Sequence, residues 1–284
     1  MPKTDTIDAL KDTRFFRESD FAEDFYAKIV DLHHWRLLAE RFDIHLRQEA
    51  GPSDPIPKRI HQIWIGGSLP RSYQVWTESW RKLNPGWEYR LWDKEAILDF
   101  GLVNEEAFRK SVSNGVKSDI ARYEILSRLG GIYADTDFEC LQPLADVARR
   151  CSFFAGTVFH ESPVIANGIM GSAPGHPLLT KLIENITGPV TTRDGMGILH
   201  KTGPFYLTRQ FFENVSLLGS SDVVFPSTYF YPLPNYAARD EIAENNTKRY
   251  ARSWSIAIHH WETSWLRAGA LRVFLNRLKN RIGL

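Results

Sequence analysis

Two aspartates spaced as Asp-x-Asp, Asp135 and Asp137, follow a short apolar run at residues 132–134. Residues i and i+2 at the end of a β-strand project to the same side, roughly 7 Å apart, so we expect both carboxylates to face one volume. Oxygen ligands favour Mg²⁺ or Mn²⁺, which keep coordination positions for the phosphate oxygens of a substrate. Because ligands of open α/β sheets bind beyond the carboxyl ends of strands, the spacing predicts a divalent-cation site at a sheet edge. Asp-x-Asp also occurs by chance, so the interpretation depends on the elements around it.

A second polar pair lies just upstream, on a helix predicted over residues 118–129 and ended by the double glycine at 130–131. Asp119 and Arg122 are three residues apart, so they share a helix face away from the apolar stripe. Helix, glycines and strand follow one another directly, so we expect this pair and the two aspartates to face the same pocket.

The surrounding sequence alternates strand-like and helix-like segments, which is typical of an α/β sheet. Apolar residues at helical spacing over 14–48 predict two packed helices, and three prolines within 51–58 end that region. We therefore expect a helical N-terminal extension (1–50), a main α/β domain (51–265) and a basic C-terminal helix (266–284). The predicted strands are 59–65, 89–92, 131–134 and 153–155, the further helices are 93–100 and 177–186, and the aromatic segment 225–235 is expected to line the site.

The composition is that of a folded protein, because 43% of the 284 residues are hydrophobic and 24% are charged. A net charge of +1 supplies no overall field to hold a polyanion, so we expect no nucleic-acid partner. The start of the chain does not resemble a signal peptide, and no stretch approaches the roughly 20 apolar residues of a membrane span. With only two cysteines, we expect a cytoplasmic protein, although a mature secreted domain or an injected effector would share these features.

Residues 266–284 combine an apolar stripe with five basic residues and no acidic one. A basic amphipathic helix binds anionic lipid, so peripheral contact with the inner membrane surface is one interpretation. The other is a terminal helix packed on the domain with a solvated basic face.

Residues 118–144 resemble the core of glycosyltransferase family 32, the DXD-containing sugar transferases, and are similar to the catalytic domains of the large clostridial glucosylating toxins. Their sequence is SDIARYEILSRLGGIYADTDFECLQPL. Upstream, IPKRIHQIWIGGSLP and WRKLNPGWEYRLWDKE resemble the first strand, the helix and the second strand of these enzymes, and NGIMGSAPGHPLL and HHWETSW look like later motifs. The resemblance covers residues 57–265. It implies a GT-A fold, a mixed sheet flanked by helices, with a nucleotide-diphospho-sugar donor and a metal, usually Mn²⁺.

The resemblance also implies functions for individual residues. Trp64 matches a tryptophan that stacks on the nucleotide base, although a tryptophan in the core of a strand is also common. Asp119 and Arg122 match the pair that holds hydroxyls of the donor sugar. Asp135 matches the first DXD aspartate, which contacts the ribose and the water shell of the metal, and Asp137 matches the second, which binds the metal directly.

The motif HHWETSW near the end of the chain adds further candidates. Adjacent residues of a strand face opposite sides, so only one of His259 and His260 is expected to meet the metal, and we assign His260. By resemblance, a hydroxyl residue, either Thr263 or Ser264, and Trp265 contact the metal and the diphosphate. We choose Ser264 as that hydroxyl.

Asn167, placed in an Asn-Gly turn, matches a polar position near the donor sugar, although Asn-Gly is also an ordinary turn sequence. We predict a metal-dependent retaining glycosyltransferase that moves a hexose from a nucleotide-diphospho-sugar, with a UDP-sugar favoured, to a hydroxyl of a glycan, glycolipid or protein. Asp119, Arg122 and Asp137 are the predicted catalytic residues, and both DXD aspartates with His260 would hold Mn²⁺ or Mg²⁺. The alternatives are a nucleotidyltransferase acting on sugar phosphates and a non-catalytic carbohydrate-binding protein.

Overall fold

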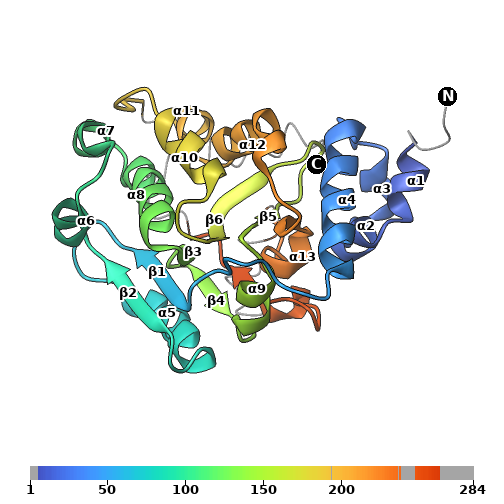
Figure 1. The fold of residues 1–284 in the computed structure, drawn as a ribbon, viewed down its shortest axis with the longest axis horizontal. Helices are drawn as coiled ribbons and strands as arrows, with labels where there is room; N and C mark the ends of the chain where they lie inside the picture. The colour runs from blue at the N-terminus through green and yellow to red at the C-terminus, as the bar shows by residue number, and fades with distance from the viewer. Residues whose placement is uncertain (1–5, 193, 236, 238–246, 263–284) are drawn as a thin grey trace.

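The computed structural model describes residues 6–192, 194–235, 237 and 247–262. Their main sheet (Figure 1) consists of β1 (Arg59–Ile63), β2 (Glu88–Trp92), β3 (Gly131–Ala134), β5 (Phe153–Thr157), β6 (Ile165–Ser172) and β7 (Asp222–Phe225). The strand order is β2-β1-β3-β6-β5-β7. β1 is parallel to β2 and β3, and β5 is parallel to β7, whereas β6 is antiparallel to both of its neighbours. The sheet is therefore mixed, as predicted.

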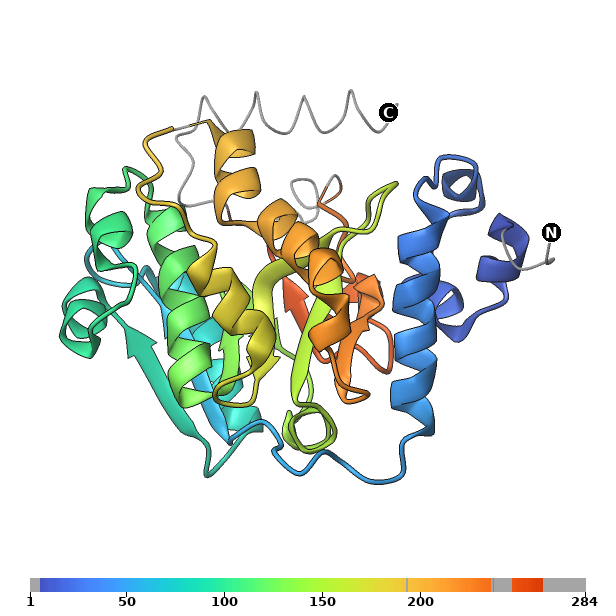
Figure 2. The same ribbon diagram turned by 45° about the horizontal axis from the view of Figure 1, so that its top comes forward.

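Helices α8 (Asn114–Leu129), α10 (Pro177–Glu184) and α12 (Pro204–Glu213) lie over one face of the sheet (Figure 2). The double glycine ends α8, because Gly130 and Gly131 have φ values of 62° and 102°. Among the described residues no helix has the length and apolarity needed to cross a bilayer. The other helices of this part are α5 (Arg71–Leu83), α6 (Lys94–Phe100), α7 (Glu105–Lys110), α9 (Ala145–Arg150), α11 (Gly195–Lys201) and α13 (Ser227–Phe230).

A second, two-stranded sheet pairs β4 (Phe138–Cys140) with β8 (Ala257–His259) in antiparallel register, so that Phe138 lies opposite His259. α5 packs against β4, where the indole Nε1 of Trp80 donates to the Phe138 carbonyl oxygen at 2.9 Å. This small sheet brings a segment from late in the chain to the turn that follows β3.

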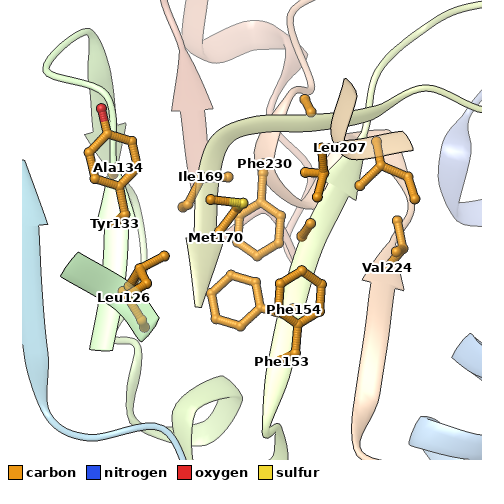
Figure 3. Close-up of a cluster of buried hydrophobic side chains, with 14 of the residues drawn as sticks. Leu126, Tyr133, Ala134, Phe153, Phe154, Ile169, Met170, Leu207, Val224 and Phe230 are labelled. Atoms are coloured by element: carbon orange, nitrogen blue, oxygen red, sulfur yellow. The ribbon is translucent and has the colours of Figure 1, made fainter. Parts of the chain in front are cut away.

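The core is centred on β5 and β6, where every residue is buried. Figure 3 shows Phe153, Phe154, Met170 and Phe230 among the buried side chains gathered around these strands. The rings of Phe154 and Phe230 are stacked with centroids 5.3 Å apart. A Cβ atom at Gly171 would lie 2.1 Å from the ring of Phe154, so glycine is required where this ring crosses β6.

The described part of the N-terminal extension has four helices: α1 (Ile7–Lys11), α2 (Arg14–Ser19), α3 (Glu23–Tyr26) and α4 (Leu32–Arg47). Three of them lie within residues 14–48, where two were predicted. Asp20 and Asp31 interrupt the helical run with φ values of 55° and 60°. α4 covers the edge strand β7, and the ring of Phe42 meets that of Phe225 at 5.9 Å. The extension therefore shares the core of the main domain.

Two further predictions are corrected by the structure, and one lies outside it. The Asn-Gly sequence at 167–168 is part of strand β6, because flanking apolar residues on both sides are buried in the sheet. Segment 225–235 is not an open loop: it begins at the end of β7, continues as α13 and is buried up to residue 234. The predicted helix 266–284 lies outside the described residues.

We expect the buried imidazole of His61 to make the fold acid-sensitive. Its Nε2 contacts the Gly130 carbonyl oxygen at 2.9 Å, and its Nδ1 accepts from Trp92 Nε1 at 3.2 Å, so the ring is neutral. Burial lowers the pKa of His61 to about 4. The unfolded chain takes up this proton near pH 6.5 and the folded chain only near pH 4, so stability should fall as the pH is lowered between these values.

Urea unfolding of the wild type and of His61→Gln at pH 7.5, 6, 5 and 4.5 measures this effect. The wild type should lose more stability than the variant over this range, by on the order of 3 kcal/mol at most. If the stability of the two proteins changes with pH in the same way, the pKa of His61 does not differ between the folded and the unfolded chain.

Candidate active site

The two DXD aspartates lie in the tight turn between β3 and β4. The Asp135 amide donates to the Gly168 carbonyl oxygen at 2.8 Å, and the Phe138 amide donates to the Asp135 carbonyl oxygen at 3.1 Å. The chain therefore turns at Asp135 and does not continue as a strand. Ligand atoms of Asp135, Asp137 and His259 all lie within 4.8 Å of one another, so these three side chains converge as a candidate metal cluster.

The histidine of this cluster is His259, and the assignment of His260 is corrected. His259 Nε2 lies 3.1 Å from Asp137 Oδ1. His260 faces the other way: its Nε2 lies 3.3 Å from Glu139 Oε2, and its ring stacks on Trp76 at 4.2 Å. Strand alternation correctly allowed only one inward histidine. The pairing of His259 opposite Phe138 decided which one, and this register cannot be read from the local sequence.

Arg122 joins the helix α8 to the DXD turn. Its Nη2 lies 3.2 Å from Asp119 Oδ1 and 3.1 Å from Asp135 Oδ1, and its Nη1 donates to the Asn167 carbonyl oxygen at 2.6 Å. Asp119 and Arg122 are both buried, 6% and 4% exposed, so they lie inside the protein and not on an open helix face. Burial raises the pKa of Asp119 to about 6, against the opposing influence of the Arg122 charge.

Asn167 extends this polar group from strand β6. Its Nδ2 donates to Asp119 Oδ1 at 2.8 Å and to the Tyr123 hydroxyl at 3.0 Å. The next residue, Gly168, leaves room for the DXD carboxylate, because a Cβ atom there would lie 3.0 Å from Asp135 Oδ2. Asn167 therefore contacts Asp119 and Tyr123 from a strand, whereas the sequence predicted a turn.

Three residues of the site were missed from the sequence. The Tyr133 hydroxyl donates to Asp135 Oδ1 at 2.5 Å, and strand alternation from Asp135 could have found it. The Tyr231 hydroxyl accepts from the Ile169 amide at 3.2 Å, and the Thr202 hydroxyl donates to Asp119 Oδ2 at 2.8 Å. Tyr231 lies in the aromatic segment 225–235, which was expected to line the site, although the residue itself was not singled out. Thr202 carries no local signal, because a distant segment brings it to the site.

Trp64 follows β1 and is partly exposed at the same sheet edge. Its ring lies 5.1 Å from that of Tyr73, which in turn meets Trp76 at 5.4 Å. The Trp64 Nε1 is buried and has no hydrogen-bond partner among the described residues. Trp76 in turn stacks on His260, so this aromatic group contacts the residue next to His259. Ser264 and Trp265 lie outside the described residues, so their assignments stay predictions.

The cluster has the donor chemistry of a divalent-cation site. Asp135 Oδ1 is engaged by Tyr133 and Arg122, whereas Asp137 has only the imidazole of His259 as a side-chain partner among the described groups. Burial raises the pKa of Asp135, although the nearby Arg122 charge acts to lower it. A bound cation would favour the ionised form of both carboxylates. Two carboxylates and a neutral imidazole fit such an ion.

Comparison with known proteins agrees with this geometry. Residues 70–154 match the family described as "Glycosyltransferase sugar-binding region containing DXD motif". The chain is 31% identical over 193 residues to the uncharacterized glycosyltransferase L373 of Acanthamoeba polyphaga mimivirus, covering 64% of this chain and 75% of the relative. It is 31% identical over 168 residues to inositol phosphoceramide mannosyltransferase 3 of Schizosaccharomyces pombe, covering 55% of this chain but 45% of that protein.

A solved structure supports the fold assignment. The catalytic domain of alpha-toxin from Clostridium novyi aligns over 96% of this chain and 90% of its own, with a TM-score of 0.53 at 10% sequence identity. At this identity the likeness concerns the fold alone, a GT-A arrangement with helices around a central mixed sheet. With its DXD turn, its fold and its relatives, the chain belongs to the glycosyltransferases whose sugar-binding region contains the DXD motif.

Proposed function

We propose that this glycosyltransferase moves a hexose from a nucleotide-diphospho-sugar to a hydroxyl acceptor with the help of Mn²⁺ or Mg²⁺, and that it retains the anomeric configuration. The observation that carries the proposal is the convergence of Asp135, Asp137 and His259 beside the buried pair Asp119 and Arg122. One group of side chains suits a cation at the diphosphate, and the other suits the hydroxyls of a sugar.

Each residue has a defined task in this proposal. Asp137 and His259 hold the cation, which when bound neutralises charge that develops on the departing diphosphate. Asp135, oriented by Tyr133 and Arg122, lies next to them. The leaving phosphate accepts the proton of the acceptor hydroxyl. Such a course needs no carboxylate nucleophile, in contrast to the paired carboxylates of glycosidases.

Our proposals for the nucleotide-sugar donor and for the acceptor rest on similarity to other proteins. We favour a UDP-sugar on the resemblance to the toxin catalytic domains. The names of several yeast relatives, inositol phosphoceramide mannosyltransferases, support mannose and a glycolipid headgroup as a second candidate. The chain spans less than half the length of these relatives. A cytoplasmic location and membrane contact through residues 266–284 stay predictions.

The experiment that tests the proposal measures hydrolysis of UDP-glucose, UDP-galactose, UDP-N-acetylglucosamine and GDP-mannose with and without Mn²⁺. We expect Mn²⁺-dependent hydrolysis of at least one donor by the wild type. Asp137→Asn should lower that rate by about 10²–10³-fold, because a neutral amide binds the cation weakly. The matched control is Asp146→Asn, since the Asp146 side chain is 70% exposed and pairs with Arg149 and Arg150, away from the Asp135, Asp137 and His259 cluster.

Three outcomes would contradict the proposal. An unchanged Mn²⁺-dependent rate in Asp137→Asn would show that Asp137 does not bind the metal. Exchange of pyrophosphate into the donor would favour a nucleotidyltransferase, and donor binding without turnover would favour a carbohydrate-binding protein.

The two adjacent histidines provide a direct test of the metal cluster. His259→Ala should raise the Mn²⁺ concentration for half-maximal hydrolysis at least about tenfold, because it removes the imidazole beside Asp137. His260→Ala should lower thermal stability, since it removes the contacts with Glu139 and Trp76, but should leave the Mn²⁺ requirement unchanged. The reverse pattern would restore the assignment of His260.

Trp64 is expected to bind the nucleotide base. Trp64→Ala should weaken binding of the donor by about 1–3 kcal/mol, because it removes the stacking of the indole on the nucleotide base. The preference among sugars should stay unchanged, because this contact does not involve the sugar. Calorimetric titration with each donor measures both effects. Trp254→Ala is the control, since Trp254 is 36% exposed and its indole contacts Thr228. A changed sugar preference at normal nucleotide affinity would place Trp64 elsewhere in the site.

A further inference from the structure

The turn between α11 (Gly195–Lys201) and α12 (Pro204–Glu213) reaches the buried polar group from a distant part of the chain. Thr202 lies in this turn and is 1% exposed. Its hydroxyl donates to Asp119 Oδ2 at 2.8 Å, across 83 positions of sequence. A buried hydroxyl bonded to a buried carboxylate is a strong, charge-assisted contact.

Hydrogen bonds also hold the backbone carbonyl and amide of Thr202 in place. Its carbonyl oxygen accepts from the Tyr123 hydroxyl at 2.6 Å, and its amide donates to the Ile198 carbonyl oxygen at 3.1 Å. Tyr123 lies one helical turn after Asp119 on α8, so one helix contacts both the hydroxyl and the carbonyl of Thr202.

The turn is also too tight to move freely. A Cβ atom at Gly203 would lie 2.9 Å from the Cα of Leu199, so glycine lets the two helices approach closely. Pro204 occupies the first turn of α12, where its fixed φ favours the start of the helix. The backbone that carries Thr202 therefore lies close against α11, and the contact with Asp119 orients its hydroxyl.

The two oxygens of Asp119 have unequal support. Oδ1 meets two groups, Asn167 Nδ2 at 2.8 Å and Arg122 Nη2 at 3.2 Å. Among the described side chains, Oδ2 has Thr202 as its hydrogen-bond donor. Rotation of the carboxylate about its Cβ–Cγ bond would move both oxygens, and the Thr202 hydroxyl is the described donor that holds Oδ2 in place.

We propose that Thr202 is a positioning residue that fixes the plane of the Asp119 carboxylate for recognition of the donor sugar. The proposal rests on the proposed function, in which Asp119 binds hydroxyls of that sugar. Thr202 acts through Asp119 and does not touch the donor. Without its hydroxyl, the carboxylate would lose the orientation that the sugar requires, while the binding site for the nucleotide would remain.

The test compares Thr202→Val, Thr202→Ser and Thr208→Val. The valine at 202 keeps the shape of threonine but removes the donor, and the serine keeps the donor. Thr208 provides the matched control on α12, because its hydroxyl accepts from the Ile165 amide and donates to the Pro204 carbonyl oxygen without contacting Asp119. The measurements are kcat and KM for hydrolysis of UDP-glucose and GDP-mannose with Mn²⁺, and the Kd values of UDP and GDP.

We expect Thr202→Val to lower kcat/KM by about 10²-fold at an unchanged Kd for the nucleoside diphosphate. Thr202→Ser should recover activity to within a few-fold of the wild type, and Thr208→Val should stay near it. If Thr202→Val loses no more activity than Thr208→Val, or if Thr202→Ser is as impaired as Thr202→Val, the proposal is overturned.

A stability measurement separates this proposal from the proposed function. Urea midpoints of the wild type, Thr202→Val, Asp119→Ala and the double variant form a cycle that needs no donor. We expect the midpoint losses to be non-additive, since either substitution removes the same contact. If the wild type hydrolyses none of the four donors tested for the proposed function, the proposed function fails. Additive losses in the cycle would overturn the contact between Thr202 and Asp119 whether or not a donor is hydrolysed.

Discussion

The buried guanidinium of Arg122 is the interaction on which the organisation of the site depends. It lies within 3.2 Å of Asp119 and Asp135 and donates to the Asn167 carbonyl oxygen, so it links α8, β3 and β6. The ring of Tyr133 covers it at 4.4 Å. The Arg122 side chain is 4% exposed, and such a buried charge is tolerated only when oppositely charged or polar partners surround it. The carboxylates of Asp119 and Asp135 depend on the Arg122 charge in the same way. The spacing of the DXD turn from the helix is therefore constrained by electrostatics as well as by packing.

A second constraint reaches the site from the N-terminal helices. The Tyr229 hydroxyl of α13 donates to Glu18 of α2 at 2.8 Å, and the Tyr229 carbonyl oxygen accepts from the Ile256 amide at 2.8 Å. Ile256 immediately precedes β8, the strand that ends at His259. Tyr231, which follows α13, meets the His259 ring at 5.7 Å. The extension thus contacts the segments that carry Tyr231 and His259, and His259 belongs to the candidate metal cluster.

The local sequence predicted the bounds of a helix or strand well where residues within or next to that element mark its ends. Strand β3 was predicted with its observed bounds, and β1 and β2 within two residues, because turn-forming or polar residues lie close to their ends. Glycines lie at the start of β3 and shortly after β1, and Asp93 follows β2. Strand β6 was missed, because its Asn-Gly pair is typical of a turn and only burial between β3 and β5 makes it a strand. The three helices within residues 14–48 were predicted as two, since the left-handed Asp20 and Asp31 carry no strong sequence signal.

For the site, the sequence alone determined the chemistry: paired aspartates after a strand, and an acid and a base three residues apart on the preceding helix. Both pairs lie within one continuous segment, so short-range geometry was enough to predict that they meet. The tertiary structure alone decided the partners that come from elsewhere, His259 in place of His260, Tyr231, and Thr202 against Asp119. These contacts depend on strand register and on how distant helices pack, which are set by long-range burial and not by the spacing of neighbouring residues.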